Sequence, residues 1–228
     1  MWNIVEYANA GRRNLDRGLK CQDYTHYEEF GTVQVITLAD GTGKDDFARL
    51  GAGKSCEVLG KLLSENYEQI YNMENEHIRF NIAVNLKTEL DLLCDQHNVQ
   101  IEQLQSTLLG LAIDHTSGTF IAVHLGDGQI EIGRKGMRRI ISYPENGNSK
   151  GQTWLTSMRK IGDHLRIIKG DIRDIEEFIL SSDGWPDQES KTRHEEKTDA
   201  AVSGEHSAEN TQEYVDDVSF ISLALQSQ

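Results

Sequence analysis

Apolar runs of strand length recur along the whole chain. Some alternate apolar and polar residues, which is typical of strands with one solvent-facing side, and others are continuous. Two neighbouring pairs of runs are separated only by turn sequences, HTS at 115–117 with Gly118 and Lys135-Gly136, which favour hairpins. The runs cover residues 2–8, 32–40, 106–114, 118–127, 129–134, 137–142, 164–170, 176–182 and 218–225, and we predict that they pair mainly antiparallel.

Two stretches change to a helical period. Within 54–71 and within 76–97, large apolar residues recur every three or four positions, as on the buried face of an amphipathic helix. Long helices beside antiparallel strands indicate an α+β fold, in which two antiparallel sheets pack face to face as a sandwich flanked by α-helices (αββα). The helical positions are Leu59, Leu62, Leu63, Tyr67 and Ile70, followed by Ile78, Ile82, Leu86, Leu90 and Leu93.

The chain length fits a single domain. A chain of 228 residues can bury a sizeable core by itself, so we assign residues 1–228 to one domain. Residues 188–213 contain no Ile, Leu, Met, Phe, Trp or Tyr, and they cannot cover a core face. We predict that this stretch is a polar, mobile surface insertion between the last two strands.

Composition narrows the location and the partners. The mean hydropathy of -0.54 and the lack of a long apolar segment predict no membrane span, and the N-terminus has no signal-peptide pattern. The cysteines, Cys21, Cys56 and Cys94, have no metal-ligand spacing and suit reduced thiols. The net charge of -14 would repel a nucleic-acid backbone. We therefore expect a cytoplasmic protein, a monomer, with neither nucleic acid nor membrane as a partner.

Carboxylates stand at the ends of several apolar runs. A single Asp-Gly pair after a strand is most simply a turn. Where adjacent strands end together, however, their carboxylates would converge on one rim and repel each other unless a cation lay among them. Carboxylate ligands suit Mg²⁺ or Mn²⁺ better than zinc. The pairs are Asp40-Gly41, Asp127-Gly128 and Asp183-Gly184, with Asp216-Asp217 directly before the last run.

The ordered motifs resemble those of the PPM-type (type 2C) metal-dependent serine/threonine protein phosphatases, in particular their compact bacterial branch. The resemblance implies direct hydrolysis of phosphoserine and phosphothreonine by a water that bridges two metal ions, with no phosphoenzyme. It extends over nearly the whole chain. The motifs are GLKCQDY (18–24), LADGTG (38–43), STLLGLAID (106–114), HLGDGQIEI (124–132), LSSDGWPD (180–187) and DDVSFISLAL (216–225).

The resemblance also implies roles for individual residues around two or three Mn²⁺ or Mg²⁺ ions. Asp40, Asp183 and Asp216 would be direct carboxylate ligands, and Gly41 would offer its carbonyl. Asp23 would hold metal-bound waters. Asp127 would join Asp183 at a third, weaker metal position, and Asp217 would orient its neighbours rather than bind metal.

Two positions depart from the family pattern. The arginine that grips phosphate a few residues before the first aspartate has no single match, and Arg17 is chosen over Arg12, Arg13 and Lys20 because a guanidinium there is close and can bind phosphate in a bidentate manner. The histidine that acts as general acid in some relatives is replaced by Thr42. A metal-bound water could serve instead, with His26 and His124 as weaker candidates.

Three functions compete at this point. The leading interpretation is an enzyme whose partner is a phosphoserine or phosphothreonine protein, with a cognate protein kinase as a candidate partner. The alternative is a catalytically silent phosphatase-like module that binds and regulates a phosphoprotein or kinase. A calcium-stabilised binding module would need more oxygen ligands for each ion. Nucleotide binding is excluded because GAGKS (51–55) lacks the complete phosphate-loop frame, with Ala48 at its first glycine position.

Overall fold

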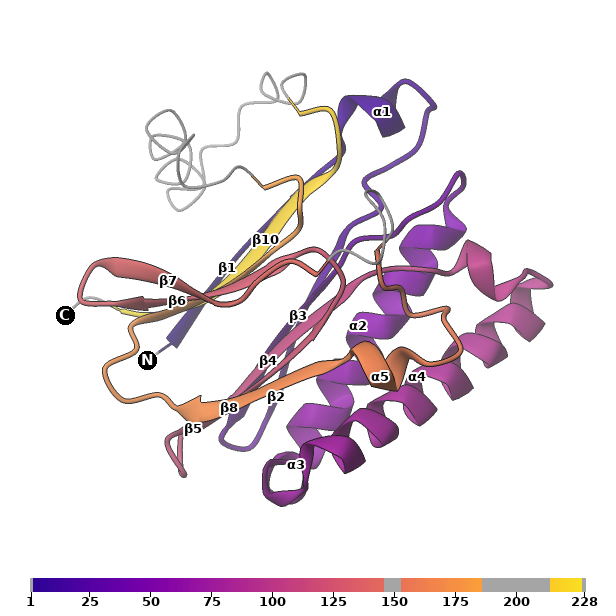
Figure 1. Ribbon diagram of the computed structural model, residues 1–228. Helices are drawn as coiled ribbons and strands as arrows, with labels where there is room; N and C mark the ends of the chain where they lie inside the picture. The colour runs from indigo at the N-terminus through magenta and orange to yellow at the C-terminus, as the bar shows by residue number, and fades with distance from the viewer. Residues whose placement is uncertain (1, 146–152, 186–213, 227–228) are drawn as a thin grey trace.

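Two antiparallel sheets pack face to face in the computed structural model, which describes residues 2–145, 153–185 and 214–226 (Figure 1). Each sheet has five strands. The first has the order β1 (Trp2–Asn9), β10 (Val218–Leu225), β9 (Glu177–Ser181), β6 (Gln129–Arg134) and β7 (Met137–Ser142). The second has the order β2 (Tyr24–Phe30), β3 (Val33–Ala39), β4 (Leu108–Asp114), β5 (Thr119–Leu125) and β8 (Arg166–Asp171). The predicted insertion at 188–213 lies outside the described residues.

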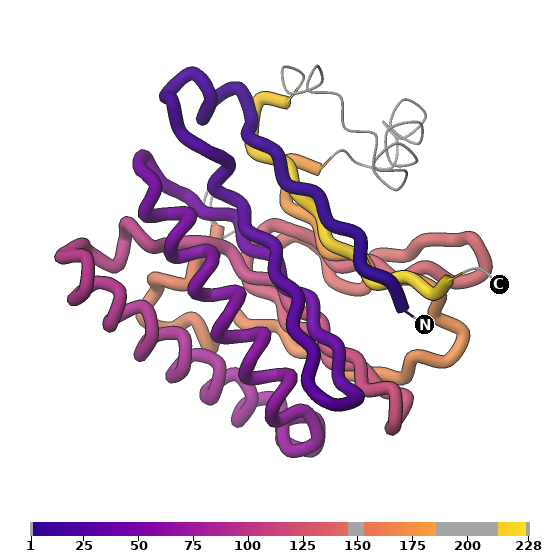
Figure 2. Tube along the Cα trace, turned by 180° about the vertical axis from the view of Figure 1, so that it is seen from behind, coloured from indigo at the N-terminus to yellow at the C-terminus, as the bar shows by residue number. Residues whose placement is uncertain are grey.

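Long helices cover the outer face of the second sheet. These are α2 (Phe47–Glu65), α3 (Tyr67–Asn72) and α4 (Asn75–His97), and Figures 1 and 2 show α2 and α4 side by side over the strands. The short elements are α1 (Arg12–Leu15), η1 (Ile101–Gln103) and α5 (Ile161–His164). Within the described residues, no helix combines the length and the apolar character needed to cross a membrane. The predicted sandwich with outer helices is confirmed.

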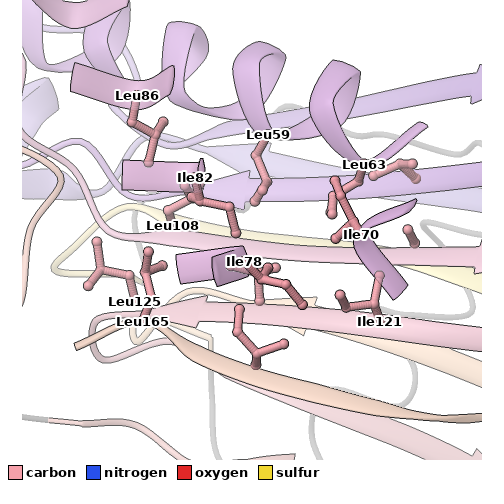
Figure 3. Packing of buried hydrophobic residues seen from close by; sticks show 14 of the residues in the cluster. Leu59, Leu63, Ile70, Ile78, Ile82, Leu86, Leu108, Ile121, Leu125 and Leu165 are labelled. Carbon is pink, nitrogen blue, oxygen red and sulfur yellow. The ribbon is translucent and has the colours of Figure 1, made fainter. Parts of the chain in front are cut away.

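The core has two layers because side chains alternate along each strand. In β3, Ile36 and Leu38 point between the sheets, whereas Val35 points towards the helices. The inter-sheet layer includes Leu109, Leu111, Phe178, Leu180 and Ile221. Figure 3 shows the other layer, in which Leu59, Leu63, Ile78, Ile82 and Leu86 from the helices meet Leu108, Ile121 and Leu125 from the sheet. A continuous apolar run such as that of β3 is therefore buried on both faces.

The predicted strands all form, with ends that differ by no more than two residues from the sequence limits. The first helix begins earlier than predicted, at Phe47, and it breaks at Asn66, which leaves the helical conformation. Strand β2 was not predicted. It lies at a sheet edge, and its YTHYEEF sequence offers few apolar residues because most of the strand is only partly buried.

Leu59 fills a space above the central strand of the second sheet. The side chain is fully buried, and a Cβ atom placed on Gly110 would lie 2.5 Å from Leu59 Cδ2. The two residues are therefore matched in size across the α2–β4 contact. Removing the leucine side chain leaves a cavity that a glycine cannot fill.

We expect Leu59→Ala to lower the free energy of unfolding by about 3–4 kcal/mol, which chemical denaturation can measure. Leu92→Ala on α4 is the matched control, because Leu92 is 48% exposed and the change should cost less than about 0.5 kcal/mol. Adding Gly110→Ala to Leu59→Ala should restore part of the loss, although Gly110→Ala alone should destabilise. Strictly additive effects would contradict this size matching.

Candidate metal centre

The predicted carboxylates gather at one end of the sandwich, where strands of both sheets begin or end. Asp40 follows β3 and Asp127 follows β5 of the second sheet, whereas Asp183 follows β9 and Asp216 precedes β10 of the first. Asp23 stands directly before β2. The carboxylates are close enough to affect each other's pKa values. Burial and the charges of Asp23, Asp183 and Asp216 raise the pKa of Asp40. Burial and the charges of Asp127 and Asp216 raise that of Asp183. The face-to-face packing thus builds one acidic cluster from both sheets.

The glycines that follow Asp40, Asp127 and Asp183 each admit a neighbouring backbone. A Cβ atom at Gly41 would lie 2.7 Å from the Gln22 carbonyl oxygen, and one at Gly128 would lie 2.7 Å from the Ser181 carbonyl oxygen. At Gly184 the distance to the Asp217 carbonyl oxygen would be 2.0 Å. The Asp-Gly pairs are therefore more than turns, because any side chain at the second position would push the strand ends apart.

Asp23 is a fully buried carboxylate with an unsatisfied oxygen. Ser219 Oγ donates a 2.6 Å hydrogen bond to its Oδ2, while its Oδ1 is buried with no hydrogen-bond donor among the described residues. Burial raises the pKa of Asp23, and the Ser219 hydrogen bond opposes this shift. An unpaired carboxylate oxygen in such a place calls for a proton or a cation.

Asp40 and Asp183 show the same demand for positive charge. Burial, followed by the charges of Asp23 and Asp183, raises the pKa of Asp40 well above its usual range. Asp183 has surface exposure as a residue, yet burial of its carboxyl group and the charge of Asp127 raise its pKa to about 6. Hydrogen bonds also hold the backbone at both aspartates. The Asp40 amide donates to Thr107 Oγ1 at 3.0 Å. Next to Asp183, the Ser182 amide donates to the Ser219 carbonyl oxygen, and the Ser219 amide donates to Ser182 Oγ.

Asp217 organises the chain rather than the cluster. Its carboxylate accepts hydrogen bonds from Gly11 N at 2.7 Å, Asn14 Nδ2 at 2.9 Å and Gln22 N at 2.5 Å. Both ends of the segment 11–22 are therefore tied to the start of β10. Both oxygens of Asp217 are engaged by donors, and its orienting role stays a prediction.

Cys21 lies beside this group. Its sulfur and a carboxylate oxygen of each of Asp23 and Asp217 are within 4.8 Å of one another. Burial, with the charge of Asp23, raises the pKa of the thiol, so the sulfur stays protonated. Because Asp217 already accepts three hydrogen bonds, this trio is a packing arrangement rather than a metal site.

Arg13 is the arginine that reaches the acidic cluster. Its Nη1 lies 2.7 Å from Asp216 Oδ2, in an ion pair that is about half exposed. The pair forms because α1 docks on the chain before β10, where the Arg12 and Arg13 amides donate to the Tyr214 and Val215 carbonyls. Arg17 is exposed and forms no ion pair within the described residues. Arg13 is therefore the stronger candidate for a phosphate contact.

Arg49 was not predicted from the sequence. Its Nη1 donates to the carbonyl oxygens of Cys21 at 2.7 Å and Asp23 at 2.6 Å, and its guanidinium stacks over the Tyr24 ring. A helix residue thus fixes the backbone that carries Asp23. No sequence signal singles it out, because its function depends on the approach of α2 to the segment before β2.

The alternative general acids lie away from the cluster. His26 contacts Glu28 at 3.1 Å and packs near Gly60 of α2. His124 is buried between Ser142 Oγ and the Gly126 carbonyl, and burial lowers its pKa to about 3, which keeps the ring neutral. Both ring nitrogens are engaged in buried hydrogen bonds, so neither is free to contact a substrate.

The donor set fits a hard divalent cation. It contains carboxylate oxygens, one of them buried and unpaired, and raised pKa values that a cation would reverse. Asp127 adds a further carboxylate, which accepts a hydrogen bond from Thr153 Oγ1. The predicted ligands are therefore brought together in space.

Comparisons with known proteins agree with this geometry. The model of the family Protein phosphatase 2C matches residues 10–218. The chain therefore belongs to the protein phosphatase 2C family. No curated protein sequence shows significant similarity to it.

Similar folds occur among solved bacterial phosphatases. A bacterial serine phosphatase with an arginine-to-glutamate substitution matches at a TM-score of 0.66 and 13% identity, with 99% of each chain covered. A serine/threonine phosphatase of Staphylococcus aureus matches at 0.63 and 12% identity, covering 100% of this chain and 96% of that one. RsbX, solved in complex with magnesium, matches at 0.58 and 14% identity, with 99% and 100% covered.

The raised pKa values predict how pH affects the metal-free protein. Between about pH 4 and pH 6, the folded state binds more protons at Asp183 than the unfolded chain does, so this group makes the folded state less stable as pH rises. Asp23 and Asp40 act in the same direction. We expect Asp183→Asn to flatten the decline in melting temperature, measured in excess EDTA from pH 4.5 to pH 7. Equal slopes for both proteins would contradict the assignment.

Proposed function

We propose that this protein is a metal-dependent protein serine/threonine phosphatase that hydrolyses phosphomonoesters. One observation supports this most strongly: carboxylates from both sheets converge at one end of the sandwich, where burial and neighbouring charges raise the pKa values of Asp23, Asp40 and Asp183. Membership of the protein phosphatase 2C family also supports a phosphatase. In this proposal the reaction depends on the carboxylates at the strand ends and needs no nucleophilic cysteine or serine.

In this proposal two or three Mn²⁺ or Mg²⁺ ions bind at the cluster. The ligands are Asp40, Asp183 and Asp216 with the Gly41 carbonyl, and Asp127 adds to a third position. Such ions, when bound, activate water for in-line attack on phosphorus and neutralise the charge of the phosphate. RsbX, whose fold is similar, was solved with magnesium.

The protein's own side chains would orient the reacting groups and hold the phosphate. Asp23, fixed by Ser219 Oγ and by the Arg49 clamp on its backbone, accepts a proton or a hydrogen bond at its free Oδ1. The Arg13 guanidinium lies at the Asp216 side of the cluster, where it can bind phosphate oxygens. Thr42 is exposed beside Gly41 and has no acidic proton to give, so the leaving group takes its proton from water.

The substrate class is a phosphoserine or phosphothreonine protein, and a cognate kinase stays a candidate partner. The alternative, a silent module that regulates a phosphoprotein or kinase, has one supporting observation: a similar fold at a TM-score of 0.60 comes from work on the bacterial stressosome. The hydrolysis assay described below decides between the enzyme and the silent module. A monomeric state and a cytoplasmic location stay predictions.

The metal requirement and the role of Asp183 can be tested together. We expect hydrolysis of an aryl phosphate to stop in excess EDTA and to return with Mn²⁺, which should also raise the melting temperature. Asp183→Asn should lower turnover at saturating Mn²⁺ on the order of a hundredfold or more, because the metal loses a charged ligand.

The control is Asp114→Asn, at a strand end where the carboxylate accepts hydrogen bonds from the Thr116 and Ser117 amides. Asn keeps one of the two acceptor oxygens, and Asp114 lies at the end of β4 opposite to the acidic cluster, so turnover should stay within about twofold. Full activity in EDTA would contradict the proposed function. Wild-type turnover in Asp183→Asn would show that Asp183 is a turn residue and not a metal ligand.

The two candidate phosphate-binding arginines can be separated by substitution. For a phosphopeptide with neutral flanks, Arg13→Gln should lower kcat/KM about tenfold, which is the effect of losing roughly 1.4 kcal/mol of transition-state binding. Arg13→Lys should fall between, because an ammonium group cannot make the bidentate contact. Arg17→Gln should stay within about twofold of wild type. The reverse order would assign the phosphate contact to Arg17.

A further inference from the structure

Positive charge is concentrated in residues 12–20, here called the cationic segment. Its four basic side chains are all exposed, and Asp16 is its single acidic residue. This local excess contrasts with the net charge of -14 for the whole chain. The basic residues are Arg12, Arg13, Arg17 and Lys20.

The cationic segment is held beside the acidic cluster. The Asp217 carboxylate binds Gly11, Asn14 and Gln22, so the segment is fixed at both ends and in its middle. Figure 1 shows α1 close to the beginning of β10. Lys20 precedes the buried Asp23 by three residues, a stretch that spans at most about 10 Å of backbone. The segment therefore forms one border of the candidate site.

Most of the charge on this border is available to a ligand. Arg13 is paired with Asp216 at 2.7 Å, and Arg12 contacts Asp16 at 3.7 Å in an exposed pair of little strength. Among the described residues, neither Arg17 nor Lys20 is in an ion pair. Salt screens electrostatic interactions beyond about 8 Å, so a peptide bound at the site interacts with the charges of this segment rather than with the net charge of the protein.

We propose that the cationic segment binds a second anionic group of the substrate, so that the preferred substrates are phosphopeptides with acidic side chains or a further phosphate near the hydrolysed residue. The second anion lies about two to four residues from the phosphoserine, given the reach of an extended peptide. This inference rests on the proposed phosphatase function, and it adds a substrate class to it. Both kinds of anion are recognised by the same cations.

The other basic region of the described chain does not have these properties. The β6–β7 hairpin carries Arg134, Lys135, Arg138 and Arg139, but Arg138 is paired with Glu177 at 3.0 Å. Strand β7 is also the edge of its sheet, where charged side chains prevent unwanted strand pairing. Its charges provide a control rather than a competing site.

The test compares four phosphopeptides with the same phosphoserine and with neutral, glutamate-containing, second-phosphoserine or lysine-containing flanks. We expect wild type to show a kcat/KM at least about fivefold higher for the two anionic peptides than for the neutral one, and the lowest value for the lysine peptide. Arg12→Gln/Lys20→Gln should reduce the anionic preference to less than about twofold. The glutamate and second-phosphoserine peptides show which anion is preferred.

Two controls separate this inference from the function on which it rests. Lys61→Gln/Arg139→Gln removes the same charge from exposed positions on α2 and β7, and it should keep the preference. Hydrolysis of an aryl phosphate should be unchanged in both double variants. If aryl phosphate and neutral peptide are hydrolysed but anionic flanks give no advantage, the inference fails and the phosphatase function stands.

A binding measurement covers the case in which no peptide is hydrolysed. The probe is the glutamate-containing phosphopeptide with a fluorescent label, and its anisotropy is measured with the full chain at low and high salt. Tighter binding by wild type than by Arg12→Gln/Lys20→Gln, lost at high salt, would support the inference even without turnover. Equal binding by the two proteins would overturn it.

Discussion

The loss of water and the mutual repulsion of clustered carboxylates form the constraint on which the rest of this structure depends. Asp23, Asp40 and Asp183 are held close together at the end of the sandwich, and their pKa values rise because each loses water and gains negative neighbours. Keeping them there costs free energy in the metal-free protein. A bound cation would reverse that cost, and metal binding would then be coupled to stability.

The two-layer core supplies the rigidity that such a cluster needs. Ile36 and Leu38 fix β3 against the opposite sheet, while Val35 fixes the same strand on the side of α2. A strand packed on both faces cannot shift by one residue without exchanging its layers. The position of Asp40 therefore follows from the packing of the strand that precedes it.

Asp217 connects the two ends of the chain at this site. By accepting hydrogen bonds from Gly11, Asn14 and Gln22, it ties the N-terminal segment to the last strand. The same contacts bring Arg13 to Asp216 and place Asp23 beside Ser219. A buried carboxylate, through its hydrogen bonds to segment 11–22, thus decides which cations border the site.

The sequence by itself determined the strands, the long helices and the aspartates of the cluster. Side-chain alternation and Asp-Gly strand ends are local signals, and the order of the family motifs fixed their common location. Tertiary structure alone decided that Arg13 rather than Arg17 reaches Asp216, that Arg49 clamps the backbone at Asp23, and that β2 completes an edge. These features depend on contacts between segments that are distant in sequence, for example the 203 positions between Arg13 and Asp216, and no local pattern records them.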